Sequence, residues 1–298
     1  MSAYIWIALL CYFCFALSSL GDKLILSRAI RRPLVYAFYI VLLSPVAFVL
    51  APFGLRRLDS AQIVIALLSG IMFCYALIFF YRAIRDSGAS RAVTMVGGLQ
   101  PLLVLLLAFL LSGERLSPMQ LAAFAALLAG SVLISLEKLS GRWTMRAIYD
   151  ALLAALLFAL SLALSKVVYN NSDFVTGLIW TKLGAALGAL TFLLHRPSRQ
   201  ILRSDIITRK PNAHKLLFIG NFALGAIATL LQNLAIARGS VSIVTALGGV
   251  QFVFVLILAH FLTAKYPKIF GEDLSLSVII QKTGAVILIG AGLVLLNI

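Results

Sequence analysis

The sequence predicts an all-α integral membrane protein with ten transmembrane helices, arranged as two inverted repeats of five helices each. Hydrophobic residues make up 62% of the 298-residue chain and charged residues only 12%, about half the charged fraction of a typical soluble domain. The apolar residues form ten runs of about 20, the length of helix that crosses a bilayer. Two segments of the chain also occur twice, and the basic residues change sides between the copies.

The ten runs are continuous rather than alternating in hydrophobicity, which favours helices over the strands of a membrane barrel. No basic stretch precedes the first run, so we expect a spanning helix there rather than a cleaved signal peptide. The expected helices are Tyr4–Leu26, Leu34–Phe53, Ala61–Tyr81, Ala89–Leu111, Met119–Leu136, Ala147–Tyr169, Phe174–Leu194, Lys215–Ile236, Val241–Leu262 and Val278–Asn297.

Two pairs of segments reveal the internal repeat. Gly88–Arg115 and Gly239–Tyr266 are identical at 11 of 28 positions, and Phe15–Lys23 resembles Phe158–Lys166. These matches make the first helix equivalent to the sixth and the fourth helix equivalent to the ninth. The expected boundaries are residues 1–136 for the first repeat, 137–146 for the connecting loop and 147–298 for the second repeat.

An odd number of helices in each repeat means that the second repeat enters the membrane upside down relative to the first. The loops agree, because loops after odd-numbered helices hold 19 Lys and Arg residues, and loops after even-numbered helices hold 5. Since Lys and Arg concentrate in cytoplasmic loops, this bias predicts that the odd-numbered loops are cytoplasmic and that both termini lie outside.

Composition also excludes several classes of protein. The net charge of +15 does not indicate nucleic-acid binding, because membrane topology explains the basic loops. The three cysteines lie inside spans without a nearby histidine, so we expect packing residues rather than a metal site. The spans contain no cluster of acids, His or Cys and no nucleotide-binding loop. We therefore expect no enzyme, cofactor or metal; the expected partners are the lipid bilayer and a small molecule, in a monomer or a homodimer.

Gln100 and Gln251 occupy equivalent positions near the middle of the fourth and ninth helices. A buried amide without a partner is costly, so both are candidates for binding a substrate; the alternative is that they bond the two repeats together. Glycine pairs weaken a helix and a proline bends it. The predicted helix breaks are Gly97, Gly98, Pro101, Gly248 and Gly249.

Other polar residues fall within the apolar runs. Lys182 is the ninth residue of the seventh helix, and a charge there indicates a functional site unless the side chain snorkels to the headgroups. Asn221 and Gln232 share one face of the eighth helix with small residues, a pattern typical of either a cavity wall or a packed helix. We expect these three residues to bind substrate.

Lys23 and Lys166 are equivalent lysines near the ends of the first and sixth helices, and Asp22 precedes the first of them. Interfacial snorkelling explains lysines at these positions. The functional alternative is a gate, in which each lysine pairs with an acid or with substrate on alternate sides of the membrane.

The segment Tyr81–Ser135 resembles the EamA-type repeat of the drug/metabolite transporter superfamily. The second repeat departs from that pattern, because Phe252 replaces Pro101 and Lys265 replaces Glu114. The family arrangement also implies that both termini are cytoplasmic, which is opposite to the charge bias. The marks of the resemblance are a turn of small residues before the fourth helix, Pro101 within it, Gly113–Arg115 at its exit and Gly130 in the fifth helix.

The resemblance implies solute transport by alternating access. Two inverted repeats can open one central cavity to each side of the membrane in turn, and without an ATP-binding loop an ion or substrate gradient would supply the energy. The cationic residues in the spans favour a small anionic or zwitterionic metabolite as the substrate. We expect the protein to export it across the cell (inner) membrane. The alternatives are a flippase for a phosphate-linked lipid, such as a polyprenyl-phosphate sugar, and a non-transporting membrane assembly protein.

Overall fold

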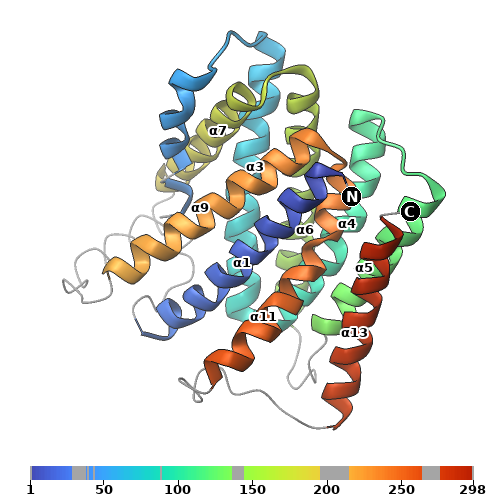
Figure 1. The fold of residues 1–298 in the computed structure, drawn as a ribbon. Helices are drawn as coiled ribbons and strands as arrows, with labels where there is room; N and C mark the ends of the chain where they lie inside the picture. The colour runs from blue at the N-terminus through green and yellow to red at the C-terminus, as the bar shows by residue number, and fades with distance from the viewer. Residues whose placement is uncertain are drawn as a thin grey trace.

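The predicted apolar runs are helical wherever the computed structural model describes them, and Figure 1 shows these helices packed side by side. Most observed boundaries lie within two residues of the expected ones. The helix bounds are α1 (Ala3–Arg28), η1 (Ser44–Phe53), α3 (Ser60–Ser87), α4 (Ala89–Ser112), α5 (Pro118–Ser135), α6 (Met145–Asn171), α7 (Phe174–Leu194), α9 (Lys215–Arg238), α10 (Val241–Ala246), α11 (Gly248–Thr263) and α13 (Leu276–Leu295). The structure describes residues 2–28, 38, 40–42, 44–87, 89–135, 144–194, 215–263 and 276–296.

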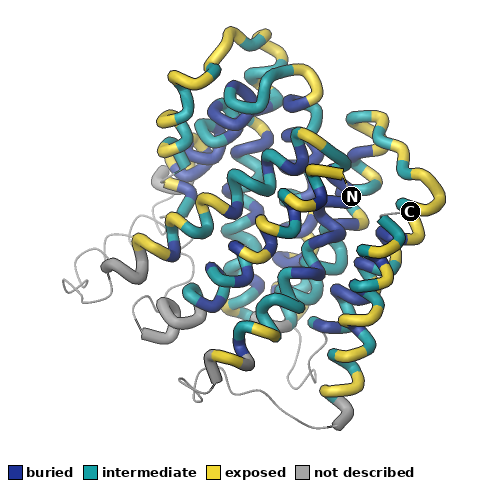
Figure 2. The backbone as a smooth tube through the Cα atoms, in the orientation of Figure 1, coloured by how far each residue is buried: buried dark blue, intermediate teal, exposed yellow. Residues whose placement is uncertain are grey.

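Nine helical segments in the described ranges are long and apolar enough to cross a membrane. The second predicted helix is described mainly as η1, a 3-10 helix of ten residues. Large apolar side chains such as Leu110 and Ile287 are exposed along the outer helices, and Figure 2 shows exposed positions on the outside of the bundle. Such surfaces are the ones expected of helices that face lipid rather than water.

The two repeats cross the bundle in opposite directions, as the odd number of helices requires. Lys166, near the end of α6, contacts Gly239 in the turn after α9. Gly239 also packs against the ring of Tyr4, near the beginning of α1. The beginning of α1 therefore lies on the same side as the end of the equivalent helix α6, which makes these helices antiparallel. The packing repeats accordingly, because α3 lies against α6 as α1 lies against α9.

Glycines bring α3 and α7 into backbone contact. A β-carbon on Gly184 would overlap the backbone of Leu67, and one on Gly70 would overlap the carbonyl oxygen of Thr181. A β-carbon on Gly188 would come within 2.8 Å of the Cys74 β-carbon. Small residues commonly allow such close approach between spanning helices. The contact fixes the rotation of α7 and directs its remaining faces away from α3.

The ninth predicted helix is one span that is divided into α10 and α11 at a single residue, Leu247, whose backbone stays in the right-handed helical region (φ −62°, ψ −10°). The equivalent helix of the first repeat, α4, continues without interruption through Gly97, Gly98 and Pro101. Of the predicted helix breaks, only those at Gly248 and Gly249 therefore adjoin an interruption. A proline inside a spanning helix is tolerated where neighbouring groups bond the freed carbonyl oxygen.

Candidate functional site

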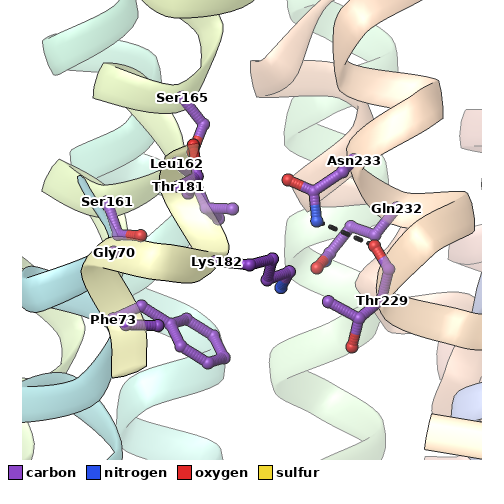
Figure 3. A pocket seen from close by; sticks show the side chains of 11 residues that line it. Gly70, Phe73, Ser161, Leu162, Ser165, Thr181, Lys182, Thr229, Gln232 and Asn233 are labelled. Atoms are coloured by element: carbon purple, nitrogen blue, oxygen red, sulfur yellow. Dashed lines mark hydrogen bonds between the residues drawn. The ribbon is translucent and has the colours of Figure 1, made fainter. Parts of the chain in front are cut away.

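A cavity with several polar side chains in its lining lies inside the bundle between two walls (Figure 3). One wall comes from α3, α6 and α7, and the other comes from α9. The cavity measures about 20 Å³, which is room for roughly one or two water molecules. The lining residues are Gly70, Phe73, Ser161, Leu162, Ser165, Thr181, Lys182, Ala185, Thr229, Gln232 and Asn233.

Lys182 supplies the positive charge of the cavity. Its side chain extends from α7 toward α9 in Figure 3, and its Nζ atom lies 5.4 Å from the centre of the Phe73 ring. This is a cation–π distance. Within the described ranges, no carboxylate forms an ion pair with Lys182. Because a charge inside a membrane protein is normally paired, this ammonium group is the candidate ligand-binding group of the cavity.

Two neighbouring amides on α9 face Lys182. The Asn233 amide nitrogen donates to the Thr229 carbonyl oxygen at 2.8 Å, and its oxygen accepts a 2.8 Å hydrogen bond from the Tyr169 hydroxyl. Gln232 hydrogen-bonds the hydroxyl of Tyr12 on α1. Both amides are therefore held in place by neighbouring helices, which fixes the polar atoms that they present to the cavity.

The wall opposite these amides carries hydroxyl groups. Ser69 donates to the Ser161 carbonyl oxygen at 2.8 Å and lies 2.8 Å from the Ser165 hydroxyl oxygen. The Thr181 hydroxyl donates to the Gly177 carbonyl oxygen, one turn earlier in α7. The serine contacts join α3 to α6, and the Thr181 hydroxyl hydrogen is used within α7.

The structure places the predicted substrate-binding residues in three locations. Lys182 and Gln232 line the cavity together. Gln100 and Gln251 are half-buried in α4 and α11 and are not among the lining residues. Asn221 lies near the beginning of α9, where its amide nitrogen donates to a carboxylate of α1. Substrate binding stays a prediction for all five residues.

The predicted gate residues also separate. Asp22 is the carboxylate that accepts from Asn221, whereas Lys166 donates to the carbonyl oxygens of Ile236 and Gly239 at 3.0 and 2.7 Å. Asp22 and Lys166 thus lie toward opposite ends of the antiparallel α1–α9 pair. The side chain of Lys23 falls outside the described residues.

Sequence reasoning missed most of the hydroxyl and amide groups in the cavity. Serine and threonine are common in spanning helices, where they bond to their own backbone, so they carry little signal. Asn233 had a clearer sequence signal, because it follows Gln232 directly and two adjacent amides are unusual in an apolar run. The missed residues are Ser161, Ser165, Thr181, Thr229 and Asn233.

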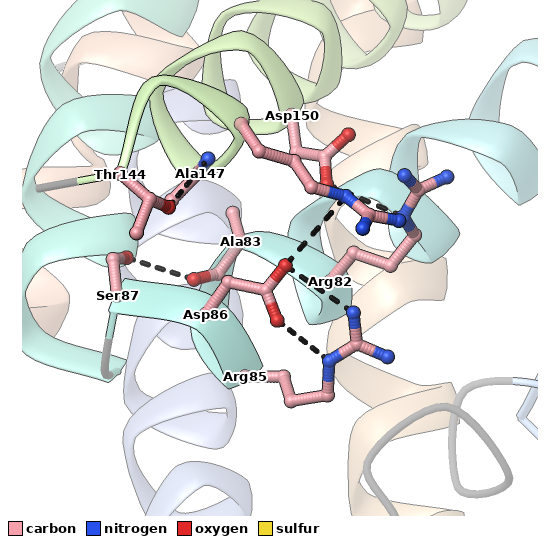
Figure 4. A network of polar contacts seen from close by, with 9 residues as sticks. Arg82, Ala83, Arg85, Asp86, Ser87, Thr144, Ala147 and Asp150 are labelled. Carbon is pink, nitrogen blue, oxygen red and sulfur yellow. Dashed lines mark hydrogen bonds and ion pairs between the residues drawn. The ribbon is translucent and has the colours of Figure 1, made fainter.

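A second polar cluster joins the end of α3 to the beginning of α6 (Figure 4). The Arg82 Nε atom lies 3.2 Å from a carboxylate oxygen of Asp150, which is 1% exposed. Arg85 pairs with Asp86 at 2.7 Å, and Arg146 approaches the same carboxylate at 3.9 Å. Each acid in this cluster has a basic partner, so the cluster fastens helix ends and leaves the central cavity as the candidate binding site.

A bundle of apolar helices built from two inverted repeats, with a cavity inside it, is the architecture of a multi-pass membrane protein of the transporter class. The model of the EamA-like transporter family matches residues 1–136 and 145–297. The chain therefore belongs to the EamA-like transporter family, as its fourth and fifth helices suggested. Members of this family, which is part of the drug/metabolite transporter superfamily, are transporters rather than enzymes.

A solved crystal structure shares the fold. The two chains are 21% identical and superpose with a TM-score of 0.67, over 97% of this chain and 93% of the other. At this identity the likeness shows the fold alone. No curated protein matches the chain.

Proposed function

We propose that this protein is a secondary-active transporter of the cell (inner) membrane, which exports a small polar, anionic or zwitterionic metabolite by alternating access. The observation that carries the proposal is the position of Lys182. Its ammonium group faces a cavity between α7 and α9, with Phe73 beneath it and the amides of Gln232 and Asn233 opposite.

The chemistry of the cavity supports an anionic group on the substrate. Burying an ammonium group is costly unless an opposite charge pairs with it, and a carboxylate or phosphate on the substrate would provide that charge. The amide groups opposite Lys182 and the hydroxyl groups on its own wall suit the remaining polar groups of a metabolite. The ring of Phe73 offers a flat apolar surface beside the charge.

The size of the cavity supports alternating access. A volume of about 20 Å³ is far below the roughly 300 Å³ or more of typical small-molecule sites. A metabolite therefore enters only when the wall of α3, α6 and α7 moves away from the wall of α9. Inverted repeats permit this motion toward either side of the membrane. An ion or substrate gradient would drive it.

Counterflow of labelled solutes into proteoliposomes tests the proposal, using parallel panels of anionic, zwitterionic and cationic metabolites. Lys182→Met removes the charge at nearly constant volume, and we expect it to weaken transport of the anionic or zwitterionic substrate about tenfold or more, as loss of a charged hydrogen bond does. Lys182→Arg keeps the charge and should retain part of the activity. The matched control is Lys282→Met, a substitution in α13 outside the cavity.

Three outcomes would contradict the proposal. Equal transport by Lys182→Met and the control would show that the charge plays no part. Transport confined to cationic solutes would reverse the proposed substrate class. Movement of a phosphate-linked lipid between leaflets, with no solute counterflow, would instead identify a flippase.

A further inference from the structure

Two charged side chains hold the turn between α9 and α10. The Glu114 carboxylate, just beyond the end of α4, accepts a 2.7 Å hydrogen bond from the Ser240 hydroxyl. It also accepts 3.2 Å hydrogen bonds from the backbone N–H groups of Val241 and Ser242. An acid of the first repeat thus satisfies backbone donors of the second repeat, which would otherwise lack helical partners.

Lys166 holds the other side of the same turn. Its ammonium group donates to the carbonyl oxygens of Ile236 and Gly239, where a cation is favourable because carbonyl groups at the end of a helix are negative. Glu114 and Lys166 are close enough to attract each other electrostatically. We call these two side chains, together with residues 236–242, the outer clamp.

The outer clamp lies next to one end of the cavity. Ser165 lines the cavity and directly precedes Lys166 in α6, and Asn233 lines it three residues before Ile236 in α9. Leu162 belongs both to the cavity wall and to the buried cluster that surrounds α10. Movement of the clamped turn would therefore uncover the cavity from this side.

The segment that follows the clamp is completely enclosed. All six residues of α10, Val241–Ala246, are buried, although the helix is short and ends at Leu247. At its far end, the Val244 carbonyl oxygen accepts a 2.7 Å hydrogen bond from the Tyr12 hydroxyl. Polar contacts at both ends thus hold a short buried segment of the second repeat against helices of the first.

We propose that Glu114 and Lys166 keep the cavity closed on the side where α9 ends, and that the outer clamp must open for the cavity to reach that side. This inference rests on the proposed transport function. The sequence makes the device one-sided, because the position equivalent to Glu114 is Lys265. A cation there cannot accept hydrogen bonds from backbone N–H groups, so the opposite side closes by different contacts.

The test measures access to a single cysteine in the cavity. Ser165→Cys is made in a full-length chain whose native cysteines Cys11, Cys14 and Cys74 are replaced by alanine, and the protein is reconstituted into vesicles. A small membrane-impermeant thiol reagent is applied to one face at a time, with an accessible N-terminal tag identifying the face on which α9 ends. We expect Glu114→Gln to raise the labelling rate about tenfold from that face alone.

A matched control separates the clamp from helix capping in general. Asp59 accepts a 3.1 Å hydrogen bond from the Ala61 N–H at the exposed start of α3, on the same side of the bundle as Glu114. Asp59→Asn should leave the labelling rate unchanged. If Glu114→Gln does not fold, Ser240→Ala removes one hydrogen bond, keeps the carboxylate, and should raise labelling by a smaller factor from the same face.

Two results would overturn the inference: a labelling rate of Glu114→Gln equal to that of the control, or a rate that rises equally from both faces, as general loosening would produce. The assay needs no substrate, so its outcome is independent of the proposed function. One-sided labelling in a protein that moves no solute would support the clamp and refute transport. Solute transport together with an unchanged labelling rate in Glu114→Gln would support the proposed transport function and refute the clamp.

Discussion

The equivalent helices α4 and α10–α11 share much of their sequence but differ in structure. α4 is one helix of 24 residues that includes Pro101, whereas its counterpart has Phe252 at that position and is nevertheless divided at Leu247. The residue equivalent to Leu247 in α4 is Val96, which lies inside unbroken helix. The position of the interruption therefore does not follow the proline.

The difference lies in what each helix contacts. Thr94 of α4 donates across to the Ser135 carbonyl oxygen of α5 at 2.6 Å, whereas the equivalent Thr245 bonds to carbonyl oxygens within α10. Tyr12 bonds the Val244 carbonyl oxygen, one turn before the interruption. Tertiary contacts of α10 thus stabilise a division that its own sequence permits but does not require.

The difference in packing between α4 and α10–α11 should have its largest effect on stability when alanine replaces the equivalent glycines Gly98 and Gly249. A β-carbon on Gly249 would lie 2.9 Å from the Ser131 β-carbon and 3.2 Å from the Leu127 carbonyl oxygen, so we expect Gly249→Ala to destabilise the protein by about 2 kcal/mol. On Gly98 the β-carbon would meet only a Val132 methyl group at 3.1 Å. That methyl can shift, and alanine favours helix by up to about 1 kcal/mol.

Unfolding midpoints of the purified variants in detergent, titrated with SDS, would measure this difference. Gly98→Ala should stay close to the parent protein, and Gly249→Ala should unfold at clearly lower SDS. Equal losses in both variants would mean that the two helices are packed alike in spite of the interruption.

A smaller effect should follow from Tyr12→Phe, which removes the hydroxyl shared between Val244 and Gln232. We expect a loss of about 1 kcal/mol, the net value of one buried hydrogen bond, together with faster amide exchange in α10 but not in α4. Tyr75→Phe is the matched control, since its hydroxyl contacts Thr191 at an exposed position. Hydrogen-exchange mass spectrometry measures amide exchange in both α10 and α4. Similar exchange in Tyr12→Phe and Tyr75→Phe would show that the Tyr12 hydroxyl does not stabilise the division at Leu247.

The smallest effect on stability should come from Pro101→Ala in α4. Because α4 already continues through the proline, we expect a change below about 1 kcal/mol in either direction. Transport should be measured in the same variant. Impaired transport with unchanged stability would show that α4 bends at Pro101 in another state of the cycle, and normal transport would confine bending to the second repeat.

Much of the fold was predictable because a bilayer imposes a simple rule on length and hydrophobicity. The predicted end of the seventh helix, Leu194, coincides with the end of α7, and the inverted repeats are confirmed by the contact of Lys166 with the turn beside Tyr4. The third helix was predicted too short, because α3 continues to Ser87. The last turns of α3 carry charged residues that pair with α6, so a search for apolar runs does not include them in the helix.

The site was less predictable, because hydropathy identifies an unusual residue but not the direction in which its side chain points. Lys182 and Gln232 were selected as polar residues in apolar runs, and the structure brings them to one cavity. Gln100 and Gln251 were selected by the same argument together with their repetition, and they lie elsewhere. Repetition records a shared ancestral segment, whereas the cavity depends on contacts that differ between the repeats.

The glycine contacts bring the backbones of α3 and α7 together, so we expect these two helices to move as one body. Phe73 and Lys182 then move together as one wall, while Thr229 and Gln232 belong to the other. A bound molecule draws the walls together only if its contacts with both improve as they approach. An anion that reaches only Lys182 and Phe73 gains nothing from that approach, so it would occupy the protein without being carried and act as a competitive inhibitor.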